Sequence, residues 1–543
     1  MKNTVGGKDG AVDIRKEQEA AGVITVFFAL LSGVFLALLF LLIESVRVQG
    51  GRTQCANIVD MGNMSVFGEY EKKMLEDYEI FGVDASCGSG DFNMERLNGK
   101  LQHYMRYNLS APEYSIPSIT FDPWNLQLMG SKVSGYALLT DDDCENFYQQ
   151  AVAYMHETAV TQLAGKLADY YQRSKKMEED QQVFEIEKNS AEKEIEELKE
   201  REEQKRDELE SNRESEAARN GETQAQPLPE EERTPSDEKK KNPLKALWKL
   251  QRKSILKAVC PDREISSGRV GPFSLYSKRL WHKKGSLKAA RPYGGLAGHL
   301  LFREYLLGTF PNFLTKDGEK KEGELAYQIE YILCGKNTDK ANLTGTAKKL
   351  LLLREGCNYA CAAADAQLSG QAQALAFSLI GWTGIPELTA ILKHAVLIGW
   401  SYGESMMDLR ILFNGGRVPA VKTKETWSVS LEKLPQIAEI LSQGSRGQEE
   451  GMNYRDHLRI LLNLQFVTTQ KRRGVDMMEM NIRSCPSLSN FQADYMVVSM
   501  NDDVTWKIHP VFSKVTSAFT GRKDAGSPDL TVKGGYEYLA GGK

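Results

Sequence analysis

The sequence has no surplus of positive charge. Its 543 residues contain 69 Lys and Arg against 73 Asp and Glu, which leaves a formal net charge of −4 at neutral pH. Proteins whose main partner is nucleic acid normally carry an excess of basic residues, so no nucleic acid is expected as a partner. The mean hydropathy of −0.42 is too low for a protein with many membrane spans. A chain of this length exceeds what one hydrophobic core usually supports, and two or three packed units are the first expectation.

The sequence also lacks the motifs that mark common catalytic sites. None of the seven histidines belongs to an H-E-x-x-H motif. The G-x-S-x-G pattern occurs at Gly399–Gly403 (GWSYG), but it lies inside the expected helix Pro386–Phe413 and not at the turn between a strand and a helix where this pattern carries a nucleophile. The tetrapeptide Gly335–Thr338 (GKNT) lacks the upstream glycine spacing of a phosphate-binding loop. No catalytic, cofactor-binding or metal-binding residue is therefore assigned, and no cofactor or small-molecule substrate is identified.

The eight cysteines show no dense disulfide framework. An even number of cysteines outside a membrane permits disulfides but does not establish them. Cys357 and Cys361 fall on one face of an expected helix, where two zinc ligands could sit, but no second pair or nearby histidine completes the set. We prefer to interpret them as small thiols that pack within an alanine-rich helix.

One long apolar run is present near the start of the sequence. Residues 21–43 read AGVITVFFALLSGVFLALLFLLI and contain no charged residue. As a helix, this run would be roughly 34 Å long, which is enough to cross a hydrocarbon core of about 30 Å. It is too long for the apolar core of a cleaved signal peptide, and no A-x-A pattern follows it. The run predicts one transmembrane helix in contact with the lipid bilayer.

The charges that flank the run predict its orientation. Four basic residues precede it, whereas only Arg47 and Arg52 follow closely; the four are Lys2, Lys8, Arg15 and Lys16. By the positive-inside rule, residues 1–20 are cytoplasmic and the bulk of the chain is extracytoplasmic, in a single-pass protein of the cell membrane. Helical character continues to about Tyr70, with an expected interruption at Gly50-Gly51, where two glycines weaken a helix.

The head of the apolar run resembles the TadE/TadG-type pilin-like proteins of tight-adherence (Tad) pilus systems. Their span begins with a motif of the form G-x-x-x-V-E-F-A-L, and Gly22–Leu30 reads GVITVFFAL, with Phe27 in place of the glutamate. In pilins that glutamate pairs with the N-terminal amine of a neighbouring subunit, so its absence argues against a cleaved, polymerising major pilin. TadG-like proteins often carry a D-x-S-x-S metal site, but Asp84–Ser89 (DASCGS) has Gly88 at the second serine position, which leaves the ligand set incomplete.

A wider resemblance covers both ends of the chain. The sequence resembles an uncharacterised Firmicutes family of single-span proteins encoded beside Tad-like pilus genes. The segments that carry this resemblance are GVITVFFALL–IESVRVQGGRTQ, SVFGEYEKKMLEDYEIFGVD, NPLKALWKL, EYILCGKNTDKANL–LLLLREGCN and GWSYGESMMDLRILFNGGRVPAVK. The resemblance implies a location and an association with an envelope assembly, and it implies no reaction.

Periodicity predicts strands near both ends of the chain and helices between them. Strands are expected at Tyr78–Asp84, Ser118–Phe121, Leu126–Leu139, Tyr327–Leu333, Phe491–Met500 and Val504–Ile508, with Ser118–Phe121 and Leu126–Leu139 forming either separate strands or a hairpin. Helices are expected after Asp143 and at Asp339–Ala364, Gln371–Ile380, Pro386–Phe413 and Tyr454–Thr468. Charged residues within Pro386–Phe413 exclude it as a second span, because charges are costly in lipid.

Residues 173–242 form a charged insertion. From Ser174 to Glu216 the sequence is rich in Glu, Lys, Gln and Arg, which predicts a helix. Phe184, Ala191, Ile195 and Leu198 approximate the heptad seam of a coiled coil for about two heptads; a solvated single helix with Glu–Lys pairs is the preferred alternative. Gly221–Asn242 has the composition of a disordered linker. The basic segment Leu244–Val259 is either a helix on an anionic membrane surface or a helix that docks on the protein.

These observations predict a helix-rich α+β protein that is membrane-anchored by one N-terminal transmembrane helix. Residues 44–172 would hold a pilin-like helix and the first part of the extracytoplasmic α+β domain, 173–242 the charged helical and disordered insertion, and 243–543 the main part of that domain. Strands from both ends of the chain would share one sheet. The expected function is a non-catalytic structural or assembly component of a Tad-like pilus or secretion apparatus, with protein partners in that assembly. The alternative is a membrane-anchored enzyme or ligand-binding receptor whose site is built from residues distant in sequence.

Overall fold

The computed structural model describes residues 9–109, 124–158, 162–220, 254–261, 263–271, 274–315, 325–380, 386–443, 450–512 and 529–539. The protein is helix-rich with one small sheet. It divides into two compact units, each assembled from separate stretches of the chain. Unit 1 comprises residues 1–146, 281–290 and 490–543, and unit 2 comprises residues 147–280 and 291–489. The predicted sequence segments 44–172, 173–242 and 243–543 remain a prediction.

Unit 1 is built around an antiparallel sheet whose strands come from both ends of the chain. Its elements are α1 (Asp9–Phe67), α2 (Lys72–Tyr78), β1 (Val83–Asp84), α3 (Met94–Leu109), β2 (Leu126–Leu138), the first residues of α4 (Asp141–Thr158), η6 (Ala493–Tyr495), β3 (Met496–Ile508) and β4 (Asp529–Glu537). β3 pairs with β2 along one side and with β1 and β4 along the other. The expectation that strands from both ends share one sheet is therefore confirmed.

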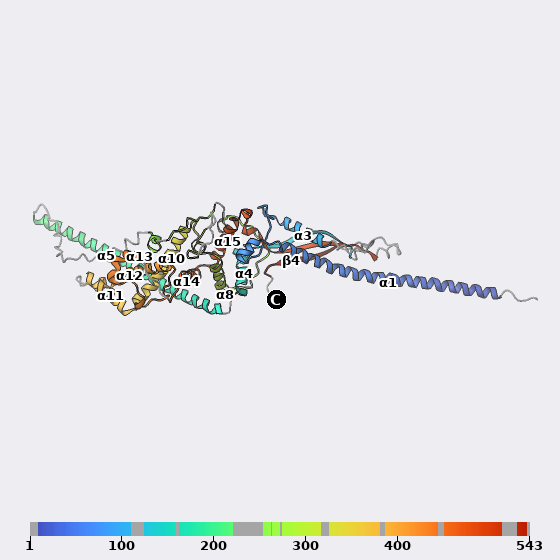
Figure 1. The fold of residues 1–543 in the computed structure, drawn as a ribbon, viewed down its shortest axis with the longest axis horizontal. Helices are drawn as coiled ribbons and strands as arrows, with labels where there is room; N and C mark the ends of the chain where they lie inside the picture. The colour runs from blue at the N-terminus through green and yellow to red at the C-terminus, as the bar shows by residue number, and fades with distance from the viewer. Residues whose placement is uncertain are drawn as a thin grey trace, which may run out of the picture. The chain divides into compact units, whose positions relative to one another are not determined.

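Only one face of this sheet is apolar. Along β3, alternate residues such as Met500, Val504 and Trp506 are fully buried, as strand geometry requires for a one-sided sheet. They form a hydrophobic cluster with side chains of α1 and α3, which cover this face. The opposite face carries Asn501 and Lys507, of which Asn501 is exposed. Figure 1 shows α1 lying along the sheet with its C-terminal half and extending beyond it with its N-terminal half.

α1 is one continuous helix, so the predicted interruption at Gly50-Gly51 is wrong. The two glycines do not interrupt the helix; they allow it to pack closely against neighbouring side chains. A side chain at Gly50 would meet the ring of Trp124 at 2.3 Å, and one at Gly51 would touch Leu126 and Ile508 at 3.4 Å. The absence of side chains lets the helix approach the end of the sheet, and this packing offsets the poor helix propensity of glycine.

The strands of unit 1 differ in part from the prediction. β1 covers only Val83 and Asp84, because the segment from Lys72 to Tyr78 is helical and Glu79 ends that helix in a left-handed conformation. β2 is one long strand over Leu126–Leu138. The predicted strands at 491–500 and 504–508 merge into β3, with η6 before it. The predicted strand at 118–121 lies outside the described residues.

The helix that follows β2 begins one residue later than its aspartates suggest. Asp142, Asp143 and Cys144 have positive φ angles, so the right-handed part of α4 starts after Cys144. Asp141 does not cap this helix, because its carboxylate accepts hydrogen bonds from the backbone N–H groups of Leu138 and Gly285.

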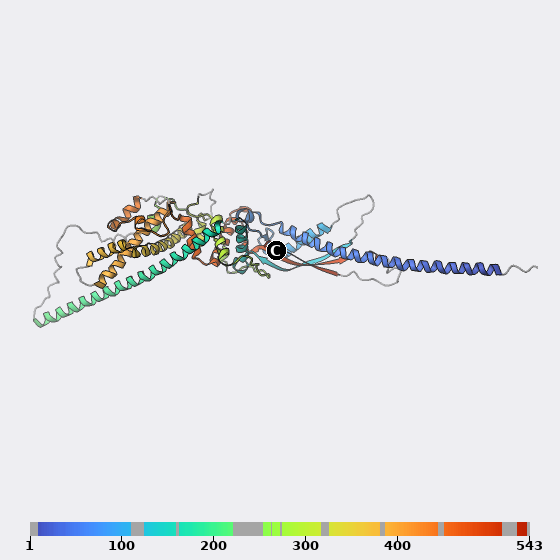
Figure 2. The same ribbon diagram turned by 90° about the horizontal axis from the view of Figure 1, so that it is seen from below.

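Unit 2 is almost entirely helical. It contains most of α4 and also α5 (Gln162–Asn220), α7 (Ile255–Val259), η1 (Tyr276–Lys278), α8 (Gly295–Thr309), α9 (Gln328–Cys334), α10 (Asp339–Ala364), α11 (Ala366–Ile380), α12 (Pro386–Phe413), η3 (Lys424–Thr426), η4 (Leu431–Gln436), α13 (Ile437–Gln443), α14 (Tyr454–Asn463), α15 (Val467–Arg483) and η5 (Pro486–Leu488). α10 and α12 pack against each other, and both contact α5 and α11. Figure 2 shows α5 running beside the other helices of this unit.

The segment predicted as a strand at Tyr327–Leu333 is instead the short helix α9. All residues from Gln328 to Leu333 are buried, so the helix has no solvent face that could produce a helical pattern in the sequence. The buried amide group of Gln328 is satisfied within the protein, because it and the amide group of Asn481 bond each other at 2.9 and 3.0 Å. The apparent alternation of apolar and polar residues therefore did not indicate a strand.

The long helices α10 and α12 have the predicted bounds, because both carry clear end signals. The side chain of Thr338 caps α10 by accepting from the N–H of Ala341, and Gly415 follows α12 with a φ of +85°. The predicted helix Tyr454–Thr468 is shorter: α14 ends at Asn463, and α15 begins at Val467.

The charged segment after residue 173 is helical, as expected, but one face of its first half is buried. Met177, Phe184 and Ala191 are buried at intervals of seven residues. Phe184 packs on Tyr359 of α10, and the backbone at Gln181 lies against Gly356 of the same helix. The apolar seam thus packs within the protein. The predicted linker at 221–242 and most of the basic segment 244–259 lie outside the described residues; α7 buries Leu256 and Val259.

Candidate functional site

The N-terminal half of α1 presents an unusual apolar surface. Every large apolar side chain from Val23 to Ile43 except Phe40 is exposed. This is the one helix among the described residues that is long and apolar enough to cross a membrane, with a mean hydropathy of 3.0 in its most apolar part. An exposed apolar surface that continues around a helix for several turns is not stable in water and requires lipid or a protein partner.

A buried ion pair marks the end of this apolar half. Arg47 and Glu44 lie one turn apart on α1, with 2.6 Å between guanidinium and carboxylate. Arg47 also donates to the backbone carbonyls of Trp124 at 2.6 Å and His509 at 2.7 Å. Glu44 accepts from the backbone N–H of Phe512 at 3.0 Å. We refer to these contacts of Glu44 and Arg47 as the helix clamp.

In the helix clamp, the positive charge of Arg47 balances the negative charge of Glu44. Burial by itself raises the pKa of Glu44, but the hydrogen bond from Arg47, the backbone N–H groups of the 509–512 segment and the Arg47 charge outweigh it, so that the pKa is lowered. The carboxylate is therefore ionised at neutral pH. In the sequence, Arg47 is recognisable only as a charge that flanks the apolar run. No local pattern indicates that it binds the backbone carbonyls of Trp124 and His509.

The near-match to a metal motif at Asp84 is a structural turn. Both carboxylate oxygens of Asp84 are occupied within the loop: they accept from the N–H and hydroxyl of Ser86 at 2.8 and 2.7 Å and from the N–H of Gly88 at 2.9 Å. This is the usual way in which an aspartate stabilises the turn that follows a strand. Among the described residues, no group of three or more His, Cys, Asp or Glu side chains is placed to hold a metal ion.

The cysteine pair on α10 packs within the protein. Cys357 is buried, which raises the pKa of its thiol to about 12. Cys361 is half-buried, and its thiol donates to the backbone carbonyl of Lys422 at 3.0 Å. A thiol with a raised pKa is a poor nucleophile and a poor metal ligand at neutral pH. The structure thus places both residues in packing roles.

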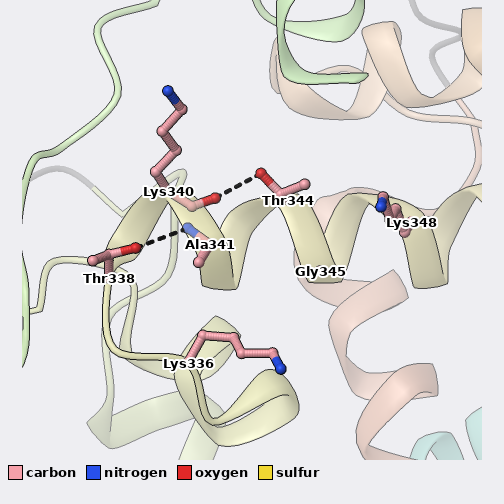
Figure 3. Close-up of a pocket in the computed structure, with 7 residues that line it drawn as sticks. All are labelled: Lys336, Thr338, Lys340, Ala341, Thr344, Gly345 and Lys348. Carbon is pink, nitrogen blue, oxygen red and sulfur yellow. Dashed lines mark hydrogen bonds between the residues drawn. The ribbon is translucent and has the colours of Figure 1, made fainter. Parts of the chain in front are cut away.

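A basic pocket lies where the GKNT tetrapeptide joins α9 to α10. Lysines 336, 340 and 348 line a depression of about 530 Å³ along the first turns of α10. Figure 3 shows that their side chains extend in different directions and do not converge on one point. Thr338 and Thr344 also line it, but the hydroxyl of Thr338 caps the helix and that of Thr344 donates to the backbone carbonyl of Lys340. Lysines near a helix N-terminus attract anions in a general way. The lining contains no carboxylate, histidine or cysteine that could serve as an acid, base or nucleophile.

A second group of ionisable residues is completely enclosed in unit 2. Arg354 of α10 lies 2.9 Å from Asp408 of α12, and Lys422 contacts both Asp408 and Glu404. Arg354 also donates to two backbone carbonyls of the segment 419–429 at 3.0 and 3.1 Å, and Glu404 accepts from two of its N–H groups at 2.9 and 2.8 Å. Two cations and two carboxylates thus hold the segment 419–429 against α10 and α12.

Burial determines what these four charges can do. Burial by itself raises the pKa of Asp408, but the adjacent Arg354 and Lys422 outweigh it and lower the pKa below its ordinary value. All four side chains are at most 4% exposed, so none of them is accessible to a substrate. The cluster is a structural connection, because breaking one partner of a buried ion pair leaves an uncompensated charge.

Comparisons with known proteins give one family. No curated protein and no solved structure matches the chain. Residues 233–508 match a family of unknown function, DUF5702. The match begins before α7 and continues to the end of β3, so it includes most of unit 2 and the central strand of unit 1. Since it covers half of the sequence, the chain belongs to the DUF5702 family.

Proposed function

We propose that the protein is a single-pass membrane protein, anchored by residues 21–43, with a cytoplasmic N-terminus and both units outside the cytoplasm. The observation that carries this proposal is the exposure of every large apolar side chain from Val23 to Ile43 except Phe40. Transfer of one large apolar side chain from water into an apolar medium is worth about 1.5–3 kcal/mol. A bilayer provides that medium along the whole run, and the basic residues before the run favour the cytoplasmic side for the N-terminus.

Outside the membrane, the protein serves as a structural or assembly component of a Tad-like pilus or secretion apparatus. Two features support this role. The C-terminal half of α1 packs on the antiparallel sheet of unit 1, so the helix whose head resembles the pilin-like proteins is continuous with a folded unit. In addition, the lining of the basic pocket contains no carboxylate, histidine or cysteine, and the ion cluster is closed to solvent. Protein partners in the same envelope assembly follow from this role.

Membrane anchoring is tested by extraction. The full chain in native membranes should stay in the pellet after an alkaline carbonate wash. A variant with Leu31→Arg and Leu38→Arg should appear in the soluble fraction, because each arginine near the centre of a span costs about 2.5–3.5 kcal/mol. Protease added to intact protoplasts should cleave the chain beyond Arg52; protection there would overturn the proposed orientation.

The assembly role requires a separate experiment. The native protein is crosslinked in its own membrane, and the partners are identified by mass spectrometry. Recovery of pilin or pilus-platform subunits would support the proposal. A deletion strain should lose its pili or the associated secretion, and normal pili in that strain would contradict the assembly role while leaving the membrane anchor intact.

A further inference from the structure

The chain that follows β3 returns along α1 toward the apolar half of the helix. Ile508 lies against Gly51, the carbonyl of His509 binds Arg47, and the N–H of Phe512 binds Glu44. The ring of Phe512 then stacks on Phe40, with 5.9 Å between ring centroids. From Gly51 to Phe40 this path covers eleven helical residues, or roughly 16 Å along the helix axis. We refer to residues 509–512 as the return segment.

The return segment reaches the level of the apolar run itself. Phe40 lies three residues before the end of the run at Ile43, which is roughly 4–5 Å along the helix axis. Any group packed beside Phe40 must occupy the same depth as Phe40. We propose that the return segment is a second membrane contact, in which Phe512 lies among lipids at the boundary between headgroups and hydrocarbon. This inference rests on the proposed membrane anchor, because it takes its depth from the span.

The chemistry of the return segment suits a lipid interface. Irregular backbone is tolerated near hydrocarbon only where its polar groups are satisfied within the protein. The helix clamp satisfies two of these groups, since Arg47 binds the carbonyl of His509 and Glu44 binds the N–H of Phe512. The intervening Pro510 has no N–H group to satisfy. The ring of Phe512 then adjoins the apolar surface of α1 at Phe40 and extends it.

The second contact has a mechanical consequence for the anchor. A single helix can tilt and rotate in a bilayer until neighbouring groups fix it. A return segment embedded on one side of α1 fixes which face of the helix is turned toward the protein and which faces lipid. The partner is therefore the lipid interface, and the contact determines how the sheet of unit 1 is held above the membrane.

Site-specific photocrosslinking tests this inference in the full chain. A benzophenone amino acid is placed at position 512 in protein reconstituted into vesicles of phosphatidylcholine and phosphatidylglycerol in equal parts. The same amino acid at Leu39, within the span, provides the positive control. At Met64, which is 62% exposed but lies roughly 30 Å beyond Ile43 on the same helix, it provides the negative control. After irradiation, mass spectrometry measures the fraction of each protein that carries a lipid adduct.

The expected result is a lipid adduct at position 512 in an amount close to that at position 39 and several-fold above that at position 64. Adducts at position 39 without adducts at position 512 would overturn the membrane contact and leave the anchor intact. No adduct at position 39 would overturn the proposed anchor itself. Hydrogen exchange of β3 and β4 in the same vesicles shows whether each variant is folded. If the variant at position 512 is unfolded, Phe512→Trp reports the contact through quenching by brominated lipids, with the unmodified protein as the background.

Discussion

At the scale of single residues, one carboxyl group links α1 to the sheet. Asp502 of β3 faces the helix and is 1% exposed, and its Oδ2 accepts from the side-chain amide of Asn63 at 2.7 Å. Among the described residues, the Oδ1 atoms of Asp502 and Asn63 have no hydrogen-bond partner. A proton on Asp502 supplies the donor that this pair lacks, because a neutral carboxyl group can donate to an amide oxygen.

The protonation of Asp502 makes the stability of unit 1 depend on pH. Burial, together with the charges of Asp503 and Asp60, raises its pKa to about 6 despite the hydrogen bond from Asn63. In the unfolded chain the pKa is near 3.8. The folded unit thus binds the proton more tightly, so this stabilisation is greatest below about pH 4 and is lost as the pH rises through 6. Its size is on the order of 1–2 kcal/mol once solvent screening is allowed for.

Replacement of this carboxyl group should remove the pH dependence. In Asp502→Asn, hydrogen exchange of β3 should no longer accelerate between pH 5 and pH 7.5 beyond the intrinsic effect of pH on exchange. The matched control is Asp529→Asn at the exposed start of β4, because this carboxyl group is not among those that shift the pKa of Asp502. The control should behave as the unmodified protein does. Equal pH dependence in the unmodified protein and in Asp502→Asn would contradict the assignment.

Residue patterns in the sequence could identify groups that act locally but not those with distant partners. The caps at Thr338 and Gly415 were predictable, because each acts on the helix next to it. The clamp at Glu44 and Arg47 was not predictable, since Arg47 binds backbone atoms that only the folded sheet brings near. The apolar run itself was visible because its meaning depends on length and composition alone.

At the scale of secondary-structure elements, a helix that is buried on all sides could not be predicted from the periodicity of its sequence. α9 is buried around its whole circumference and therefore lacks the periodic pattern that reveals α10 and α12. α1 continues through two glycines because Trp124 and the sheet fill the space that their side chains would occupy. In both cases tertiary packing outweighed local propensity. The apolar seam of α5 was visible in the sequence, but the sequence did not identify the helix that covers it.

The contact between α5 and α10 depends on one glycine. A side chain at Gly356 would meet the Cα of Gln181 at 2.6 Å and its backbone nitrogen at 2.8 Å, so one of the two helices would have to move. Gly356→Ala should therefore lower the free energy of unfolding by about 1–3 kcal/mol, in the range of an overpacked core. It should also increase the hydrogen exchange of residues 177–191.

A second glycine provides the matched control for this prediction. Gly370 lies within α11, and a side chain there would meet nothing within 4 Å. Gly370→Ala should therefore raise the free energy of unfolding by roughly 0.5–1 kcal/mol through helix propensity alone. Chemical unfolding of both variants in detergent measures the two effects. An equal increase in both variants would show that Gly356 is not a close contact.

At the scale of the whole molecule, the oxidation state of the cysteine thiols depends on the compartment in which the protein lies. All eight cysteines are free; four of them are buried, namely Cys55, Cys144, Cys260 and Cys357. Burial raises the pKa of Cys55 and Cys260 to about 11, so few thiolates are present at neutral pH. A fold that buries its thiols in this way can keep them reduced even outside the cytoplasm.

Alkylation of the isolated protein tests this expectation. Without reductant, the four buried thiols should react slowly in the folded protein, and all eight should react after denaturation. The folded and denatured samples are compared by intact mass. Fewer than eight adducts after denaturation would show that disulfides or oxidised cysteines form in the native compartment. Rapid reaction of all eight in the folded protein would contradict the described burial.

Unit 1 is assembled from both ends of the chain, and this arrangement determines the order in which the protein can fold. α1, β1 and β2 are synthesised first, but β3, the strand that pairs with both, is made only after the whole of unit 2. The ribosome therefore releases α1 and two unpaired strands long before their partner exists. Contacts between residues so distant in the chain form slowly, because a long loop must be closed first. The sheet beside α1 is thus the last part of the molecule to be completed, and a chain truncated anywhere in unit 2 would keep α1 but could not build the sheet.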